Sequence, residues 1–290
     1  MRALVVGGTG SIGSWITAQL LARGDRVVVL HRGRRAAADL PADAISVISD
    51  TPLSALAPYE AALRHGEPDV VIHVLAMIEA DARTAVAALT GRAGRLVALS
   101  SGDVYRAYGR FTGHEPGPIE PTPLNADTSP LRERLYPYRT PATNPGDRLH
   151  DYDKIPVEQA FREAAALPSV ILRLPKVYGP DGNADLATVY GFAAHPRWKW
   201  THGYVENVAA AAVLAAHHPA APGRTYNVGE AITPTVGERL AGLPHREATS
   251  APTEGFNLAQ DIAYDTAPIR RELGYSEPVP YEQGLRRTLG

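Results

Sequence analysis

The chain has 290 residues, of which 44% are hydrophobic and 21% charged, and its formal net charge is -2 at pH 7. Charges of both signs are mixed, and no basic run exceeds HRGRR at 31–35, so nothing indicates a nucleic-acid or membrane partner. The absence of cysteine excludes disulfides, thiolate metal sites and cysteine nucleophiles. No apolar run reaches the ~18 residues of a membrane span, and the chain enters a strand at once, leaving no room for a signal peptide. We therefore expect a cytoplasmic protein.

The first half of the chain alternates short β-branched segments with Ala/Leu-rich segments. The predicted strands are apolar on both faces, as buried parallel strands are, and cover 2–8, 26–32, 44–49, 69–76 and 94–101. The predicted helices between them cover 12–23, 53–65 and 79–90. This βαβ rhythm predicts an α/β fold of the Rossmann type, with a doubly wound parallel sheet.

The second half is less regular. Residues 106–149 are rich in proline and show little periodicity, which is typical of a functional or poorly ordered loop. A helix at about 153–166, a strand at 169–175 and a helix at 204–218 follow, and the chain after 230 reads as a small irregular lobe. We expect residues 1–174 with about 203–229 to form a nucleotide-binding domain, and about 175–202 with 230–290 to form a small substrate-binding lobe.

The segment VVGGTGSIGSWI places three glycines between the first strand and the first helix. Gly7 allows a tight turn, Gly10 lets the backbone approach a pyrophosphate, and Gly13 allows close packing of helix and strand. Amide groups at the helix start then face the anion. The sequence therefore predicts a dinucleotide site, and its other expected contacts are Thr9, Ser11, Ile12 and, after the fourth strand, Leu75.

The residues after the second strand indicate which dinucleotide is bound. A carboxylate there would bind the adenosine ribose and repel a 2′-phosphate, but the chain has no acid before Asp39. It has basic side chains instead, which suit a phosphate dianion: His31, Arg32, Arg34 and Arg35. We predict NADP(H) in preference to NAD(H); the alternative is a solvated basic loop. Asp50, after the third strand, is expected to hold the adenine amino group or to cap a helix.

Several motifs together resemble the extended short-chain dehydrogenase/reductase superfamily, of the NAD(P)-dependent epimerase/dehydratase type. They lie in the family's order and cover the chain to about residue 230: GGTGSIG, DVVIHVLA, LSSGDVY (99–105), RLPKVYGP (173–180), GYVENVAAA (203–211) and TYNVG (225–229). The resemblance implies the Rossmann-type fold, a nicotinamide cofactor and a homodimer formed through the 153–166 helix.

The resemblance also implies catalytic positions. Ser101 stands where the family has a serine or threonine that hydrogen-bonds the reacting oxygen. Lys154 stands at the lysine that holds the nicotinamide ribose and lowers the pKa of the catalytic acid, an alignment fixed by Glu158. Asp103 falls where the dehydratases carry a glutamate, whereas Gly102 replaces their neighbouring aspartate, so that pair is incomplete.

The segment HDYDKIPVE (150–158) departs from the family, because His150 occupies the position of the catalytic tyrosine. On a regular helix His150 shares a face with Lys154 and Tyr152 does not. Pro156 distorts a helix that begins before Tyr152, whereas an N-cap at Asp153 places the proline harmlessly at the third helical position and lets Tyr152 turn inward. Histidine is chemically able to transfer a proton near neutral pH. Both residues therefore remain candidates for the catalytic acid. The alternative is that the site has lost its catalytic activity.

Four residues are expected to contact substrate: Asp103, Tyr105, Lys176 and Tyr178. Lys176 indicates an anionic or carbonyl-bearing substrate, or else a surface lysine at a strand end. Only some twenty residues, 181–202, separate the VYGP motif from the GYVENV helix, which is short for a nucleotide-diphosphate pocket. Trp198 and Trp200 then either floor a smaller pocket or pack between lobes.

These features predict an NADP(H)-dependent reductase, dehydrogenase or epimerase acting on a small polar substrate, with Ser101 polarising the oxygen. The alternative is a cofactor-binding regulator without catalysis. A third hypothesis, an RNA-associated protein, is opposed by the net charge of -2 and the lack of a basic stripe. No metal is expected, because no His, Asp or Glu cluster has ligand spacing.

Overall fold

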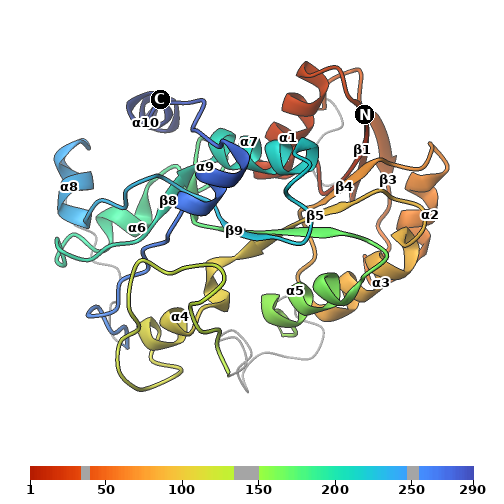
Figure 1. Cartoon of the computed structure of the whole chain (residues 1–290). Helices are drawn as coiled ribbons and strands as arrows, with labels where there is room; N and C mark the ends of the chain where they lie inside the picture. The colour runs from red at the N-terminus through yellow and green to blue at the C-terminus, as the bar shows by residue number, and fades with distance from the viewer. Residues whose placement is uncertain (34–39, 134–149, 247–254) are drawn as a thin grey trace.

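The computed structural model describes residues 1–33, 40–133, 150–246 and 255–290. Seven parallel strands form one sheet in the order β3-β2-β1-β4-β5-β6-β9 (Figure 1). The strands are β1 (Arg2–Val6), β2 (Arg26–His31), β3 (Ile45–Ile48), β4 (Val70–His73), β5 (Leu96–Ser101), β6 (Ser169–Leu174) and β9 (Thr225–Asn227). The strand order reverses direction between β1 and β4, where doubly wound sheets bind their ligands. The prediction of a Rossmann-type parallel sheet is confirmed.

Helices cover both faces of the sheet because successive side chains of each strand point to opposite faces. On one face Val5 and Val29 pack under helices α1 (Ser11–Ala22), α7 (Val205–His217) and α9 (Ala267–Leu273). On the other face Leu4 and Val6 pack under α2 (Ala57–Leu63), α3 (Glu79–Leu89) and α5 (Lys154–Glu163). Both faces of every central strand are therefore buried, which explains why the strands read as continuous apolar runs.

A second group of elements lies beside the carboxyl ends of the strands (Figure 1). It contains the two-stranded pair β7 (Lys176–Tyr178) and β8 (His202–Tyr204), with the short helices η2 (Gly102–Val104), α4 (Arg106–Phe111), α6 (Ala187–Tyr190), α8 (Val236–Ala241) and α10 (Tyr281–Leu289). The sequence did not indicate α4, α8, α9 or α10, because helices of six to nine residues are too short to show a clear periodicity.

An aromatic cluster forms the core of this second group. Phe111 is stacked between Trp198, with ring centroids 5.0 Å apart, and Phe256, at 4.7 Å. Phe192 and Trp200 pack against the same rings. The tryptophans therefore belong to a packed core, and the Pro-rich segment contributes Phe111 to it. Of the two alternatives for Trp198, packing is correct, since that side chain is 3% exposed.

A buried ion pair ties α5 to the sheet. Glu158, 1% exposed, accepts two hydrogen bonds from the guanidinium of Arg173 on β6, at 3.0 and 2.8 Å. It also accepts one from the Ser100 hydroxyl, at 2.6 Å. Burial alone would raise the pKa of Glu158, but the hydrogen bonds and charge of Arg173 hold it below its ordinary value. The pair fixes the start of α5 against β5 and β6.

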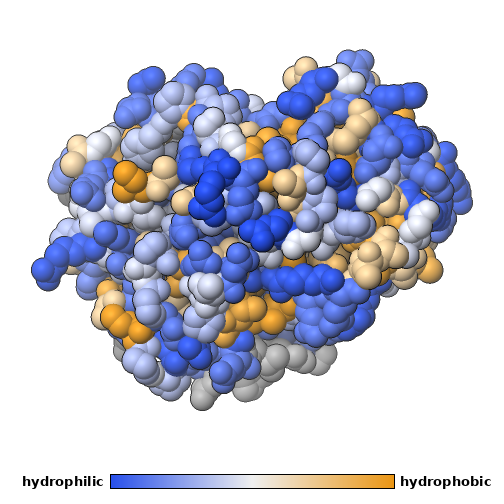
Figure 2. All heavy atoms as spheres, in the orientation of Figure 1, coloured by the Kyte–Doolittle hydropathy of each residue, from blue (hydrophilic) through white to orange (hydrophobic). Residues whose placement is uncertain are grey.

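The visible surface carries few large apolar areas. Figure 2 shows a mainly hydrophilic face on which hydrophobic side chains lie in small separate groups. Within the described ranges, none of the helices has the length and apolar character needed to cross a membrane.

We predict that Glu158→Gln lowers the free energy of unfolding by about 3–5 kcal/mol, because it leaves the Arg173 charge buried and uncompensated. The pKa of Glu158 is lowered on folding by Arg173, so its stabilisation is present above the ordinary pKa of a glutamate and is lost as the pH falls from there through the lowered pKa. Urea unfolding at a series of pH values measures both effects. Glu163→Gln, on the exposed side of α5, is the control; equal stability of the two variants would contradict the prediction.

Candidate cofactor and proton-transfer site

The loop between β1 and α1 has the geometry of an anion site. Gly7 adopts φ +95°, and a Cβ on Gly13 would lie 2.1 Å from the Gly7 carbonyl oxygen, so helix and strand approach closely there. A Cβ on Gly10 would meet nothing nearer than 3.5 Å, which leaves the backbone open to a ligand. No side chain caps α1, and its first turn holds no acidic residue, so its amides and dipole are available to a pyrophosphate.

The side chains expected around this loop lie close to it. Thr9, Ser11 and Ile12 are half-buried at the start of α1. Leu75 packs directly on Gly7, since its Cγ would lie 2.5 Å from a Cβ there. Gly182, in the turn after β7, lies beside the Ser11 hydroxyl. The residues present therefore fit a dinucleotide.

The structure gives His31 a different role from the predicted one. Its Nδ1 accepts a hydrogen bond from the Gly33 amide at 3.2 Å, so the proton is on Nε2, which lies 2.8 Å from the Ser46 hydroxyl. Burial lowers the pKa of His31 and favours the neutral ring. Because both ring nitrogens are engaged within the protein, the prediction that His31 binds a cofactor phosphate is not supported; the residue holds the turn after β2.

Other predicted residues near this end of the sheet are exposed. Arg32 is exposed directly after β2, while Arg34 and Arg35 lie outside the described residues. Asp50 is also exposed, after β3. The helix-cap alternative for Asp50 is wrong, because α2 begins at Ala57 with Leu56 as its N-cap.

The start of α5 decides the geometry of the HDYDKIPVE segment. The Asp153 carboxylate accepts a hydrogen bond from the Ile155 amide at 3.0 Å, so Asp153 is the N-cap and Lys154 the first helical residue. Pro156 is then at the third helical position, where its missing amide costs nothing. His150 and Tyr152 both precede the helix, and the expectation that His150 shares a helical face with Lys154 is therefore wrong.

Tyr152 turns inward and meets the end of β5. Its hydroxyl donates a hydrogen bond to Asp103 Oδ2 at 3.0 Å. The Asp103 amide donates to the hydroxyl oxygen of Ser101 at 3.4 Å, which links the three residues. Ser101 is half-buried, and among the described residues its hydroxyl proton has no acceptor. His150, by contrast, lies on a turn, with its Nε2 3.9 Å from the neighbouring Asp151 carboxylate.

Arg132 holds this arrangement together, although no sequence pattern indicates it. Its guanidinium donates to the Asp103 carbonyl and, at 3.0 Å, to the Asp153 carboxylate. It therefore joins the helix cap to the short η2 turn that carries Asp103. The residue falls in the Pro-rich segment, where no motif or periodicity singled it out.

Lys154 lies behind Tyr152 and is 4% exposed. Its ammonium donates to the backbone carbonyls of Ala76, after β4, and Leu99, on β5. It lies 5.9 Å from the centre of the Tyr152 ring. Burial lowers the pKa of Lys154 to about 8, against the opposing effect of nearby carboxylates including Asp103.

Tyr264 explains why a glycine stands at position 102. A Cβ on Gly102 would lie 1.4 Å from the Tyr264 hydroxyl oxygen, so that hydroxyl fills the space of any larger side chain. The position at which the dehydratases carry an aspartate is therefore closed in this chain. The glycine at position 102 could have indicated that another residue packs closely against the backbone there. It could not indicate that this residue is Tyr264.

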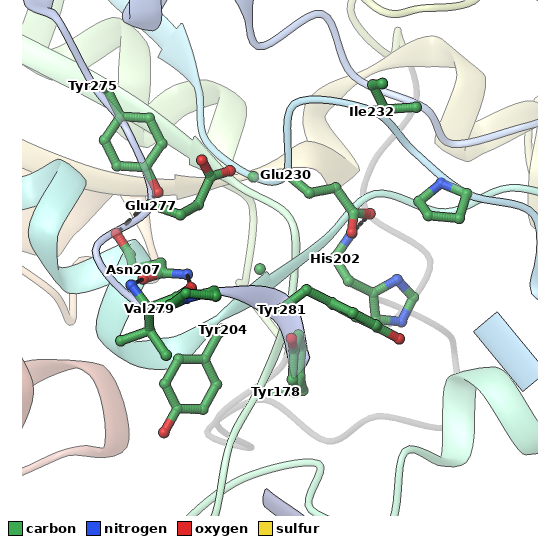
Figure 3. A pocket seen from close by; sticks show the side chains of 14 residues that line it. Tyr178, His202, Tyr204, Asn207, Glu230, Ile232, Tyr275, Glu277, Val279 and Tyr281 are labelled. Carbon is green, nitrogen blue, oxygen red and sulfur yellow. Dashed lines mark hydrogen bonds between the residues drawn. The ribbon is translucent and has the colours of Figure 1, made fainter. Parts of the chain in front are cut away.

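The four predicted substrate residues lie in different surroundings. Tyr105 is fully buried; its hydroxyl donates to Asn227 at 2.6 Å and its ring stacks on Arg173, so in this structure it cannot touch a ligand. Lys176 is half-buried, with its ammonium 5.6 Å from the centre of the Trp200 ring. Tyr178 is 4% exposed and lines a separate cavity (Figure 3). Only Asp103 joins the proton-transfer group.

Comparison with known proteins agrees with the fold. Residues 3–130 match the model of the NAD dependent epimerase/dehydratase family. No curated protein matches the chain in sequence. Similar solved structures include the Bordetella bronchiseptica enzyme WbmH in complex with NAD+, at TM-score 0.72 and 18% identity, covering 99% of this chain and 96% of that one.

Two UDP-glucose 4-epimerases are also similar. The Thermus thermophilus enzyme, in complex with NAD, has a TM-score of 0.67 and 21% identity, covering 100% of this chain and 98% of that one. The Thermotoga maritima enzyme, with UDP-glucose, has a TM-score of 0.70 and 19% identity, covering 100% and 97%. At these identities the structures establish the shared fold.

Gly10 and Gly13 provide a matched test of the loop. Gly10→Ala should weaken NADP+ binding while leaving stability nearly unchanged, because its Cβ would meet only the Gly7 carbonyl oxygen, at an ordinary contact distance of 3.5 Å. Gly13→Ala should lower the melting temperature, because its Cβ collides with the Gly7 carbonyl. Calorimetric titration and thermal unfolding measure the two properties. Unchanged NADP+ affinity in Gly10→Ala would argue against a pyrophosphate at this loop.

Proposed function

Because residues 3–130 match the model of the NAD dependent epimerase/dehydratase family, we propose that this chain is an oxidoreductase or epimerase-type enzyme. It binds a nicotinamide dinucleotide and acts at a carbonyl or hydroxyl-bearing carbon of a small polar substrate. The observation that carries the proposal is the hydrogen bond between the Tyr152 hydroxyl and Asp103, the residue whose amide bonds to the Ser101 hydroxyl at the end of β5. The end of β5 lies at the carboxyl edge of the sheet, as does the glycine loop after β1.

Each residue of this group has a distinct part. When bound, the cofactor accepts or supplies the hydride. Ser101 donates its hydroxyl proton in a hydrogen bond to the substrate oxygen. During oxidation Tyr152 takes the proton of the substrate hydroxyl while passing its own proton to the Asp103 carboxylate, and during reduction both protons move back. Lys154 keeps a positive charge behind the ring, which favours loss of the tyrosine proton.

The surroundings favour a small substrate. The aromatic cluster around Phe111 and Trp198 fills the second group of elements, and Tyr264 closes the space beside Gly102. The closure beside Gly102 also argues against dehydration by a carboxylate pair. Lys176 has its pKa lowered by burial and lies over Trp200, so it is suited to an anionic or carbonyl-bearing substrate.

We further propose that NADP(H) is preferred to NAD(H). The support is the basic run after β2, in which Arg32 is exposed, and the absence of a carboxylate before Asp39 in the sequence. The relatives whose structures contain a cofactor hold NAD. This chain is proposed to differ from them at that one strand end.

The catalytic proposal is tested with Tyr152→Phe and His150→Gln. With NADPH and a panel of small aldehydes and ketones, Tyr152→Phe should lower kcat by about 10²–10⁴ without weakening NADPH binding, because only proton transfer is lost. His150→Gln should retain most of the rate. The opposite ranking would show that His150 has replaced the tyrosine, and comparable rates in both variants would remove both residues from the mechanism.

The cofactor preference is tested by calorimetry with NADP+ and NAD+. We expect the wild type to bind NADP+ more tightly by about tenfold or more, since charge-assisted hydrogen bonds contribute about 1.5–3 kcal/mol. Replacing Arg34 and Arg35 together by alanine should abolish the difference, while Arg286→Ala on α10 should not. Equal affinities of the wild type for NADP+ and NAD+ would contradict the proposal and would indicate that the basic loop is solvated and binds no phosphate.

A cofactor-binding regulator is the second candidate, and the position of Lys154 favours it. Its ammonium is engaged by two backbone carbonyls, whereas the family lysine holds the nicotinamide ribose. A regulator binds NADP(H) tightly and turns over none of the carbonyl panel, and Tyr152→Phe changes nothing measurable. The same assays therefore separate the two candidates.

A further inference from the structure

A cleft of about 430 Å³ opens at the amino edge of the sheet, opposite the edge that carries the glycine loop and Ser101. Its walls come from the last turn of α5, from the segment after it, and from the starts of β6 and β9. Ser101 pairs with Leu174, the last residue of β6, and a six-residue strand is roughly 17 Å long. The cleft is therefore remote from the proposed active site.

Two arginines line this cleft. Arg162, in the last turn of α5, donates through Nη2 to Glu158 at 2.6 Å and to the Thr225 hydroxyl at 3.3 Å. Arg224, directly before β9, donates through Nε and Nη2 to Glu272. Among the described residues, Nε and Nη1 of Arg162 and Nη1 of Arg224 have no acceptor. The two side chains are 41% and 42% exposed, so a ligand can approach these donors.

The carboxylates paired with these arginines do not neutralise them. Glu158 also pairs with Arg173 at 2.8 Å, and Glu272 also pairs with Arg271 at 3.1 Å. Four guanidinium groups thus share two carboxylates. One positive charge remains in excess even when Glu163, which is in the last turn of α5 but does not line the cleft, is included. The cleft is therefore positively charged and attracts anions.

The partial negative charge at the end of α5 is offset by local contacts. Free carbonyl oxygens at the carboxyl end of a helix repel anions. Here the carbonyl oxygen of Phe161 accepts a hydrogen bond from the Ser169 hydroxyl at 3.1 Å, and that of Ala164 accepts one from the Leu167 amide at 2.9 Å. Arg162 lies in the same turn, where a positive charge balances the helix dipole.

The remaining walls are apolar. Ala164, Ala165, Pro168 and Pro222 line the cleft, and Phe161, which is 1% exposed, lies beneath them. Cavities of about 300–1,000 Å³ with apolar walls and a few placed polar groups hold small organic ligands. The cleft can therefore hold an organic group attached to the anion.

The donors suit a phosphate better than a carboxylate. Guanidinium groups bind phosphate through charge-assisted, often bidentate hydrogen bonds, and a phosphate offers three oxygens to donors that come from different directions. Here the donors come from α5 and from the start of β9. The Thr225 hydroxyl accepts from Arg162, so its own proton remains available to a further oxygen.

We propose that this cleft binds a phosphate dianion, held by Arg162, Arg224 and Thr225. The dianion is either inorganic phosphate or the phosphate group of a small organic molecule, and both offer the same oxygens to these donors. The site goes beyond the proposed function and does not depend on it, because none of the cofactor or proton-transfer residues lines the cleft. Its ligand is an effector and not a substrate, since it binds at the opposite edge of the sheet from Ser101.

Calorimetric titration of the full chain at about pH 8, with excess NADP+ present, tests the proposal. The probes are inorganic phosphate and glycerol 3-phosphate, with succinate as a dicarboxylate of similar charge and glycerol as a neutral molecule. We expect both phosphates to bind, more weakly as NaCl is raised, succinate to bind at least about tenfold more weakly, and glycerol not to bind. Tighter binding of glycerol 3-phosphate identifies an organic phosphate as the ligand; equal affinities identify inorganic phosphate.

Substitutions locate the binding site. Arg162→Gln and Arg224→Gln should each weaken phosphate binding about tenfold, through the loss of a charge-assisted hydrogen bond. Arg287→Gln is the matched control, because Arg287 is 43% exposed and is also paired with one carboxylate, Glu206. Ala165→Glu should abolish binding because it adds a carboxylate to the wall, whereas Ala165→Gln, of similar size, should retain it.

Three outcomes would overturn the proposal. They are the absence of binding by either phosphate, equal phosphate affinities of Arg162→Gln and Arg287→Gln, and binding of succinate as tight as that of phosphate. Thermal unfolding of each variant checks the fold. Ala165→Glu keeps both arginines and their ion pairs, so it tests the charge of the cleft without removing a contact. None of these measurements involves turnover, so failure of the proposed enzymatic function would leave them interpretable.

Discussion

The hydrogen bond from the Ile155 amide to the Asp153 carboxylate fixes where α5 begins, and the proposed chemistry depends on that position. An N-cap of this kind contributes about 1 kcal/mol, and a proline deeper in the helix would cost about 3 kcal/mol. Both effects favour the same starting point. Because the helix begins at Lys154, Tyr152 lies before it and its backbone is not helical. Its hydroxyl can therefore reach Asp103.

The same helix carries the two charged groups that position it. Lys154, at its first residue, bonds to backbone carbonyls at the ends of two strands, and Glu158, one turn later, pairs with Arg173 on the sheet. The helix is therefore held to β4, β5 and β6 by buried polar contacts. Tyr152 and Asp103 are brought together by these contacts and by Arg132, and not by a shared helical face.

Much of the fold could be predicted from the sequence, because the strands are apolar on both faces and the glycine loop sits between a strand and a helix. The helix cap at Asp153 was one of two stated alternatives, and local propensities alone could not choose between them. His31 was misjudged because its partners, Ser46 and the Gly33 amide, depend on the pairing of β2 with β3. Tyr105 was misjudged for a similar reason, since Arg173 and Asn227 are distant in the sequence. Arg132 and Tyr264 lie in segments without periodicity, and only the tertiary structure brings them to Asp103 and Gly102.

The central claim is that Tyr152, and not His150, faces the reacting carbon. A crystal structure with NADP+ bound tests it most directly, through the distances from the Tyr152 and Ser101 hydroxyls and the His150 ring to C4 of the nicotinamide. We expect Tyr152 and Ser101 to converge on the space beside that carbon, with His150 remote. A structure in which His150 lines that space and Tyr152 points away would contradict it.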